Sequence, residues 1–324
     1  MNDWYAVRVV ATREVADGVL ELRLVRPDGQ ALPDWEPGAH LDVQTPAGVR
    51  QYSLCGDPAD NTYTIAVLRE ETGRGGSRAL HDLAAPGVEL QVLGPRNHFP
   101  LVEDAEDYLL IAGGIGVTPI RAMADRLART GARWRLHYGG RSRASMAYAD
   151  ELLDLGGDVV RLYPQDTDGL LDLGAILAEA GPGTVVYCCG PAPLLDAAAG
   201  AVAASPAREL RVERFTGPTA PMPEPGGAPA DDAVTPTSFV VELAASGGSV
   251  EVGPDRSILE AVRSAGVDVI SSCEEGWCGT CETRVLAGVP LHRDEVLTPS
   301  EQASNEVMMI CVGRSCSERL VLDL

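Results

Sequence analysis

The chain has 324 residues and 45% of them are hydrophobic, so it is long enough for two or three domains with cores of their own. Its formal net charge of −21 counts against binding to nucleic acids or anionic membranes, which need basic patches, and suits either docking to a positively charged protein or simple solubility. The sequence has no apolar run of about 18 residues to span a membrane. Its N-terminus lacks the basic and apolar regions of a signal peptide, so we expect a cytoplasmic protein.

The first hundred residues predict a small antiparallel β-barrel. Leu20, Leu22 and Leu24 alternate along one predicted strand and share one of its faces. Turn sequences such as Pro27-Asp28-Gly29 separate this strand from its neighbours. The predicted strands are residues 4–13, 19–26, 41–45, 51–54, 62–68 and 88–93, in a domain of residues 1–102.

Two motifs in this domain indicate a bound phosphorylated aromatic ligand. Arg50-Gln51-Tyr52-Ser53-Leu54 places a cation, an aromatic ring and a hydroxyl on one short strand. Gly73-Arg74-Gly75-Gly76-Ser77 leads into a short helix, whose first amides and dipole favour a phosphate group. Each motif alone is also typical of an ordinary strand or an ordinary turn, and only their combination favours a site.

Together the two motifs resemble the flavin domain of the ferredoxin–NADP reductase superfamily, most closely the branch of phthalate dioxygenase reductase and vanillate O-demethylase reductase. Members of that branch carry FMN, so the resemblance implies FMN rather than FAD. It also implies the roles of the motif residues. Arg50 and Ser77 would hold the phosphate with the amides of Gly75 and Gly76, Tyr52 would lie against the isoalloxazine, Ser53 would hydrogen-bond near its N5 atom, and Leu54 would complete the flavin site.

Residues 103–216 change to alternating strands and helices, which predict a doubly wound parallel sheet. The turn that ends in Gly116-Val117-Thr118-Pro119 follows a short apolar strand and opens a helix, with Thr118 as the expected cap and Gly131 as the expected end. Cys189-Gly190-Pro191 follows a later strand at the same edge of the sheet. The predicted strands are residues 108–112, 134–138, 159–163, 184–189 and 209–215, and the other predicted helices are residues 146–155, 173–180 and 193–203.

In the family that the chain resembles, these two turns form the site for a pyridine nucleotide. The resemblance therefore implies that Ser53, Thr118 and Cys189 lie closest to the transferred hydride. The implied contacts of the nucleotide and the flavin with this domain are Gly114, Gly116, Thr118, Cys189, Gly190 and Phe215.

The preference between NADH and NADPH stays open. Arg141 and Arg143 follow the second strand of the sheet, where an adenosine ribose commonly lies, and two arginines there suit a 2′-phosphate. The family mostly uses NADH, which favours NADH with NADPH as the alternative.

A last domain of residues 237–324 follows a linker of residues 217–236, which is rich in proline and glycine. Phe239, Val241 and Leu243 alternate, and Ser257 and Glu260 form a capping box that opens a helix. Strands are predicted at residues 249–252, 282–286, 307–312 and 320–322. One helix packed on a mixed sheet predicts a β-grasp domain, and the order of three domains resembles that of the same family.

Cys273, Cys278 and Cys281 lie in one loop with Cys-x4-Cys-x2-Cys spacing, and Cys311 follows on a predicted strand. This is the plant-type arrangement for a [2Fe–2S] cluster. A zinc site more often has two Cys-x2-Cys pairs or histidines, and a disulfide framework fits poorly with the rest of the chain.

We therefore expect a multidomain α+β oxidoreductase, a monomer, that passes electrons from NAD(P)H through FMN and a [2Fe–2S] cluster, one at a time, to an oxygenase. A flavin accepts a pair of electrons and releases them singly, so it must stand between the nicotinamide and the cluster. The expected acceptor is a Rieske-type demethylase or dioxygenase, and a cytochrome P450 is the alternative. A plain iron–sulfur electron carrier without turnover and a structural zinc protein are the alternatives of other classes.

Overall fold

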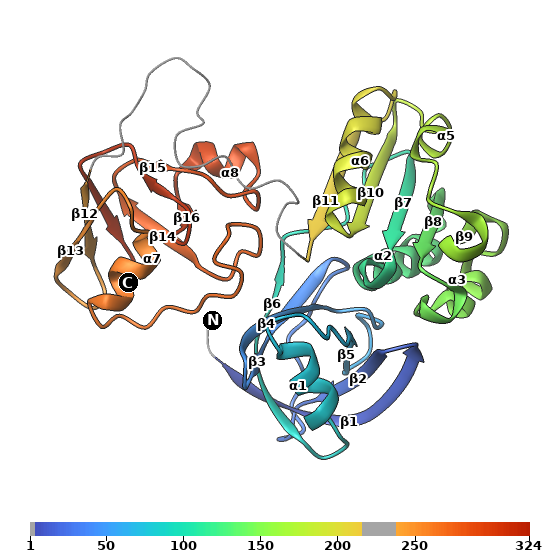
Figure 1. Ribbon diagram of the computed structural model, residues 1–324, viewed down its shortest axis with the longest axis horizontal. Coiled ribbons are helices and arrows are strands. Elements are labelled where there is room, and N and C mark those ends of the chain that lie inside the picture. Colours follow the sequence, from blue (N-terminus) through green and yellow to red (C-terminus); the bar gives the residue numbers. More distant parts are fainter. Residues whose placement is uncertain (1–3, 216–237) are drawn as a thin grey trace. The chain divides into compact units, whose positions relative to one another are not determined.

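A computed structural model describes residues 4–215 and 238–324 (Figure 1). The chain divides into two compact units, residues 1–215 and 216–324. The predicted linker of residues 217–236 lies outside the described residues.

The first part of unit 1 is the predicted antiparallel barrel. Its strands run in the order β4-β3-β6-β1-β2-β5, and a bridge between Leu54 and Ile65 joins the two edges of the sheet. Leu22 and Leu24 are fully buried in its core, as the alternation predicted. The elements are β1 (Tyr5–Ala16), β2 (Val19–Val25), β3 (Ala39–Thr45), β4 (Gly48–Ser53), β5 (Tyr63–Leu68), α1 (Gly76–Leu83) and β6 (Glu89–Asn97).

The second part of unit 1 is a five-stranded parallel sheet with strand order β11-β10-β7-β8-β9. Leu110 and Ala112 of β7 pack with α2 on one face, and Leu109 and Ile111 pack with α5 and α6 on the other, so the sheet is doubly wound. Its elements are β7 (Asp107–Gly113), η1 (Gly114–Gly116), α2 (Val117–Thr130), β8 (Trp134–Gly140), η2 (Arg143–Ser145), α3 (Ala149–Gly156), η3 (Gly157–Val159), β9 (Val160–Pro164), α4 (Gln165–Asp168), α5 (Leu173–Leu177), β10 (Thr184–Gly190), α6 (Ala192–Ala203) and β11 (Glu209–Arg214).

Two helices of this sheet differ from their predicted bounds. Tyr148 has a φ of 59°, in the left-handed region, which cannot belong to a right-handed helix, so α3 begins at Ala149 rather than at Met146. The amides of Glu179 and Ala180 bond to carbonyls three residues back, so the α-helical bonding of α5 ends at Leu177.

Unit 2 is a mixed sheet with strand order β13-β12-β18-β14-β16, on which α7 packs. The side chains of Ser257 and Glu260 bond reciprocally across the start of α7, as predicted. A second capping box, Thr298 and Glu301, opens a helix that the sequence analysis missed. The elements are β12 (Phe239–Leu243), β13 (Ser249–Val252), α7 (Ile258–Ser264), β14 (Glu282–Ala287), β15 (Pro290–Leu291), α8 (Pro299–Ser304), β16 (Val307–Met309), β17 (Arg314–Ser315) and β18 (Arg319–Leu322).

Among the described residues, no helix combines the length and the apolar character needed to cross a bilayer.

Candidate functional site

The start of α1 forms an anion cradle with Arg50 of β4. Gly75 caps the helix with a φ of 89°, and in the described part of the chain this cap has no side-chain hydrogen bond. Arg50 donates to the carbonyls of Val49, Ala47 and Arg74, which fix its guanidinium beside this start. A Cβ atom on Gly76 would lie 2.4 Å from the Cγ atom of Arg50, so the Arg50 side chain would have to move from its place in the cradle.

The charges of this cradle favour an anion. Burial and the nearby charge of Arg74 lower the pKa of Arg50, since two guanidinium groups are held close together. The guanidinium of Arg78 also lies near Gly75. Three cations at one helix start suit a phosphate group. The hydroxyl of Ser77 accepts a hydrogen bond from the amide of Glu70 at 3.1 Å. This bond closes the loop between Glu70 and Ser77 and uses part of the hydrogen-bonding capacity of the hydroxyl.

The other residues of the β4 motif divide between the surface and the core. Tyr52 is partly exposed, and burial raises the pKa of its hydroxyl, so it stays a neutral ring. Ser53 is buried at the end of β4. Leu54 is fully buried in the barrel core.

The two glycine turns of the parallel sheet touch one another. A Cβ atom on Gly116 would lie 2.3 Å from the carbonyl oxygen of Cys189, and one on Gly190 would lie 3.0 Å from the Cα atom of Gly113. Only glycine permits this close approach of β10 to the turn after β7. Gly114 has a φ of 54° and open space beside its Cα atom. The predicted nucleotide residues of both turns therefore come together at the carboxyl edge of the sheet.

The role expected for Thr118 as a helix cap is wrong. Gly116 is the N-cap residue of α2, and Thr118 lies inside the first turn, buried. Its hydroxyl donates to the carbonyl of Ile115 at 3.0 Å and so closes the turn from within.

The barrel and the parallel sheet meet at the carboxylate of Glu213 on β11. The hydroxyl of Ser53 donates to Glu213 Oε2 at 3.5 Å, and Cys189 Sγ lies 4.0 Å from the same oxygen. Burial raises the pKa of Glu213 to about 8. Burial and the Glu213 carboxylate also raise the pKa of Cys189 well above its ordinary value, so its thiol stays protonated.

Sequence reasoning missed Glu213. The residue stands in the segment that ends with Phe215, and only its neighbour Phe215 was expected to contact the flavin. Phe215 is partly buried against the core that the barrel and the sheet share. The sequence feature that could have identified Glu213 is an acidic residue inside the last strand of a parallel sheet, two positions before that aromatic residue.

One of the two arginines in the loop after β8 is paired with an acidic residue of the protein itself. Arg143 forms an ion pair with Asp150 of α3. The carbonyl of Arg141 accepts a hydrogen bond from the amide of Asp166 in α4, which brings an acidic turn beside this loop.

The four predicted cluster cysteines are buried together in unit 2. Hydrogen bonds from the thiols of Cys278 and Cys311 lower the pKa of Cys273 below its ordinary value, and Cys281 also contacts Cys311. The amide of Glu275 donates to Cys273 Sγ at 3.3 Å. Four clustered sulfur atoms with amide donors suit an iron–sulfur cluster, in which the ligands are thiolates.

One expectation about the fourth ligand is wrong. Strand β16 ends at Met309, and Cys311 lies in the turn that follows it rather than on a strand. The amides of Val312 and Gly313 both bond to the carbonyl of Met309, and this tight turn directs the chain back toward the cluster loop.

The cluster loop is held in shape by glycines and by the side chain of Arg263. Gly276 and Gly279 have φ values of 78° and 73°, and a Cβ atom on Gly276 would lie 2.6 Å from the side chain of Val312. Arg263 of α7 donates to Glu274 and to Ser271 on the approach to the loop.

Among the described residues, no three acidic, histidine or cysteine side chains form a group that could hold a single metal ion. A two-iron cluster instead needs its thiolates in pairs, one pair for each iron.

Two family models match the chain. Residues 110–168 match an oxidoreductase NAD-binding domain, and residues 241–316 match a 2Fe-2S iron-sulfur cluster binding domain.

Curated relatives match over nearly the whole length of both proteins. The phenoxybenzoate dioxygenase subunit beta of Ectopseudomonas oleovorans is 44% identical over 98% of this chain and 97% of its own. The phthalate dioxygenase reductase of Burkholderia cepacia is 38% identical over 98% and 97%. The vanillate O-demethylase oxidoreductase of a Pseudomonas species is 39% identical over 98% and 99%.

Solved structures of related proteins are also similar, among them the following two. A phthalate dioxygenase reductase, described as a modular structure for electron transfer from pyridine nucleotides to [2Fe-2S], matches 99% of this chain and 98% of its own, with 37% identity and a TM-score of 0.68. An intact type IV self-sufficient cytochrome P450 monooxygenase matches 99% of this chain with 43% identity and a TM-score of 0.89. The present chain spans 41% of that longer protein.

Proposed function

The chain belongs to the family of phthalate dioxygenase reductase and vanillate O-demethylase reductase, and from this premise we propose that it uses NADH and FMN to supply a Rieske-type oxygenase with single electrons. The family is one of NAD(P)H-dependent reductases that transfer electrons through a flavin and a [2Fe–2S] cluster to an oxygenase component. What is proposed is the identity of the flavin, of the nucleotide and of the acceptor, and the role of each residue.

The convergence of Ser53, Cys189 and Glu213 carries the proposal. It brings the end of the flavin-side strand β4 within hydrogen-bonding reach of the edge of the nucleotide sheet. Hydride transfer needs donor and acceptor rings in direct contact, because a misplacement of 1 Å can cost about 100-fold in rate.

The anion cradle supports FMN. Arg50 and Arg78 lie at the start of α1 and the charge of Arg74 acts on Arg50, which suits a terminal phosphate monoester with up to two negative charges. Arg50 and the amides of Gly75 and Gly76 would hold this phosphate. Tyr52 would supply a neutral aromatic surface for the flavin ring.

The loop after β8 supports NADH. Arg143 is paired with Asp150, so its positive charge is less available to bind a 2′-phosphate. Asp166 and Asp168 lie on the turn beside Arg141, and carboxylates suit the free hydroxyls of an NADH ribose.

FMN, when bound, accepts two electrons as a hydride and gives them up one at a time. The proton that accompanies the hydride would come from the protein's own groups. The raised pKa of Glu213 keeps its carboxyl group protonated at neutral pH, and Ser53 links it to the flavin side of the site. Cys189, also protonated, would fill the space beside the nicotinamide without adding a negative charge.

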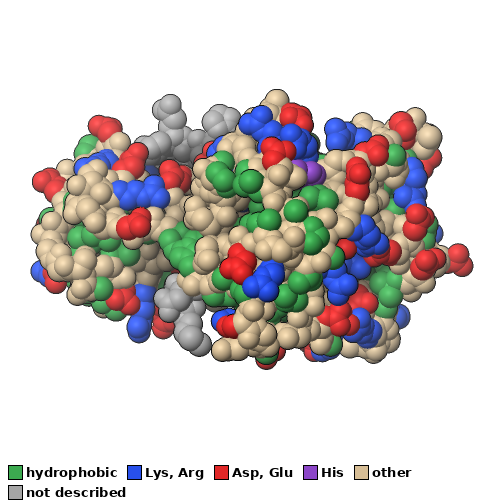
Figure 2. All heavy atoms as spheres, turned by 90° about the horizontal axis from the view of Figure 1, so that it is seen from below, with side chains coloured by type: hydrophobic (Ala, Val, Ile, Leu, Met, Phe, Trp, Pro, Cys, Tyr) green, Lys and Arg blue, Asp and Glu red, His purple; other side chains and the backbone are tan. Residues whose placement is uncertain are grey.

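The four cysteines of unit 2, Cys273, Cys278, Cys281 and Cys311, would hold the cluster that passes each electron on. The acceptor is proposed from the relatives named for dioxygenase and demethylase systems. On the face shown in Figure 2, acidic and basic side chains lie side by side, so the net charge of −21 is not concentrated there. Steering of a basic partner would then depend on other local patches.

A cytochrome P450 is the second candidate acceptor, because the P450 monooxygenase chain with a TM-score of 0.89 contains a region like this whole protein. The test is reconstitution of the purified protein with NADH and either a Rieske oxygenase or a P450. The proposal expects flavin extracted by heating to be FMN, and faster turnover with the Rieske partner. Release of FAD, or turnover only with the P450, would contradict it.

A further inference from the structure

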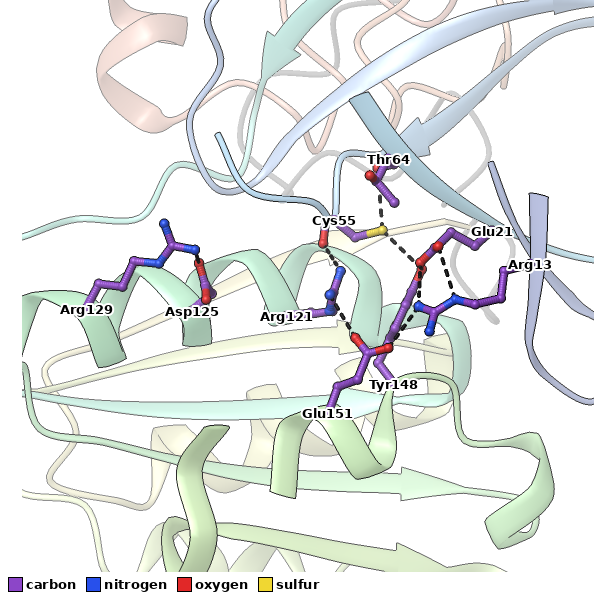
Figure 3. Close-up of polar contacts among 9 residues, drawn as sticks. All are labelled: Arg13, Glu21, Cys55, Thr64, Arg121, Asp125, Arg129, Tyr148 and Glu151. Carbon is purple, nitrogen blue, oxygen red and sulfur yellow. Dashed lines mark hydrogen bonds and ion pairs between the residues drawn. The ribbon is translucent and has the colours of Figure 1, made fainter. Parts of the chain in front are cut away.

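A polar network links the barrel to the parallel sheet within unit 1 (Figure 3). None of its side chains belongs to the expected flavin or nucleotide contacts. The barrel supplies Arg13, Glu21 and Cys55, and the domain of the parallel sheet supplies Arg121, Tyr148 and Glu151.

Tyr148 is the buried centre of the network. Its side chain is 3% exposed, and its hydroxyl donates to Glu21 Oε2 at 2.9 Å. Cys55 Sγ lies 3.5 Å from the same hydroxyl, and the guanidinium of Arg121 covers the ring, with Cζ 4.3 Å from the ring centre. The left-handed backbone of Tyr148 is costly for a residue with a Cβ atom, so these contacts hold it in place.

Arg121 bonds to two groups at once. One nitrogen of its guanidinium donates to the carbonyl of Cys55, and the other donates to Glu151 at 2.8 Å. Glu151 in turn accepts from Arg13 of β1 at 2.8 Å. Arg121 thus joins α2 both to the barrel and to α3.

The bond from Arg121 to the Cys55 carbonyl joins two segments that are expected to hold the two reacting rings. Arg121 lies three residues, or about 4.5 Å of helix, after Thr118 in the nucleotide turn. Cys55 lies two residues after Ser53 at the end of β4. The bond from Arg121 to Cys55 therefore ties the segment expected to bear the nicotinamide directly to the segment expected to bear the flavin.

We propose that Arg121, held by Tyr148 and Glu151, is a positioning residue that sets the distance between nicotinamide and flavin for the transfer of one hydride. This inference rests on the proposed function, since it takes both rings to bind at these two segments. These polar groups suit the task, because Tyr148 is buried and the Arg121 side chain is only 24% exposed, so any other alignment of the two domains would leave a donor without its partner. Apolar contacts alone would tolerate small shifts.

The test is the rate of flavin reduction in purified protein mixed anaerobically with saturating NADH in a stopped-flow instrument. Arg121→Met removes both bonds with similar side-chain length, and Tyr148→Phe removes a single oxygen atom. Arg126→Met is the matched control, because Arg126 lies on the same helix and pairs with the exposed Glu103. Flavin content and the NADH dissociation constant are measured for each variant.

The inference expects the limiting rate to fall about 10-fold or more in Arg121→Met and by a smaller factor in Tyr148→Phe, with NADH affinity nearly unchanged. The long-wavelength absorbance of stacked nicotinamide and flavin should weaken in parallel. Unchanged limiting rates in both variants, with only lower thermal stability or weaker NADH binding, would overturn it. If Arg121→Met does not fold, Tyr148→Phe decides. Failure of NADH to reduce the wild-type flavin would instead refute the proposed function.

Discussion

The substitution Gly116→Ala, which adds a single carbon atom, is a strict test of the nucleotide site. In Gly116→Ala the Cβ atom would lie 2.3 Å from the carbonyl oxygen and 2.4 Å from the carbonyl carbon of Cys189. Ordinary contact begins at about 3.4 Å, so the turn and β10 must separate by about 1 Å. Both contacts are backbone atoms, which cannot swing aside as a flexible side chain does.

The expected cost has two parts. Overpacking of this kind costs about 1–3 kcal/mol in stability. A shift of about 1 Å at the hydride-transfer site would slow flavin reduction by up to about 100-fold. Both follow from the same displacement, so they should appear together.

The assay is anaerobic stopped-flow reduction of the flavin by NADH, with thermal unfolding measured on the same preparations. Gly200→Ala is the matched control, because Gly200 lies in helix α6 with open space beside it, and alanine there should leave the rate unchanged and raise stability slightly. A Gly116→Ala protein that reduces its flavin at the wild-type rate would refute the reasoning that these two turns form the nucleotide site.

Three further predictions address the flavin, the carboxylate and the cluster. Arg50→Gln should weaken FMN binding by about 10- to 100-fold, because a charge-assisted bond to phosphate is lost, and flavin retention on dialysis measures this; equal retention would count against the cradle. The pKa of Glu213, raised by burial to about 8, means that the folded state holds a proton that the unfolded state releases near its ordinary value of 4.5, so stability should decrease from about pH 4.5 to about pH 8. Glu213→Gln should remove this part of the slope in denaturant unfolding followed from pH 5 to 9, and parallel curves for the two proteins would contradict the burial argument. Cys278→Ser should abolish reduction of a one-electron acceptor protein while NADH still reduces the flavin, and survival of both steps would show that the electron order is wrong.

Local patterns in the sequence were sufficient for most of the fold. Alternation of Leu22 and Leu24 predicted a buried barrel strand, and the spacing of the loop cysteines predicted their grouping, since both depend on neighbours in the chain. The capping box of α7 was found the same way. The equivalent pair at Thr298 and Glu301 was present and was missed.

The contacts that complete the site depend on segments far apart in the sequence. Glu213 is an ordinary acidic residue until β4 and β10 bring Ser53 and Cys189 beside it. In the same way, no spacing connects Cys55 with Tyr148, 93 positions later. The turn at Cys311 also escaped prediction, because Met308 to Val312 is an apolar run that reads equally well as a continuous strand.

An anaerobic titration of the purified protein with NADH, followed by absorbance and by electron paramagnetic resonance at low temperature, tests the central claim most directly. The account predicts that NADH bleaches the flavin and also produces the paramagnetic signal of a reduced [2Fe–2S] cluster, with no other electron donor present. Flavin bleaching without that signal, in protein shown to contain two irons, would contradict the transfer of electrons from nucleotide through flavin to cluster.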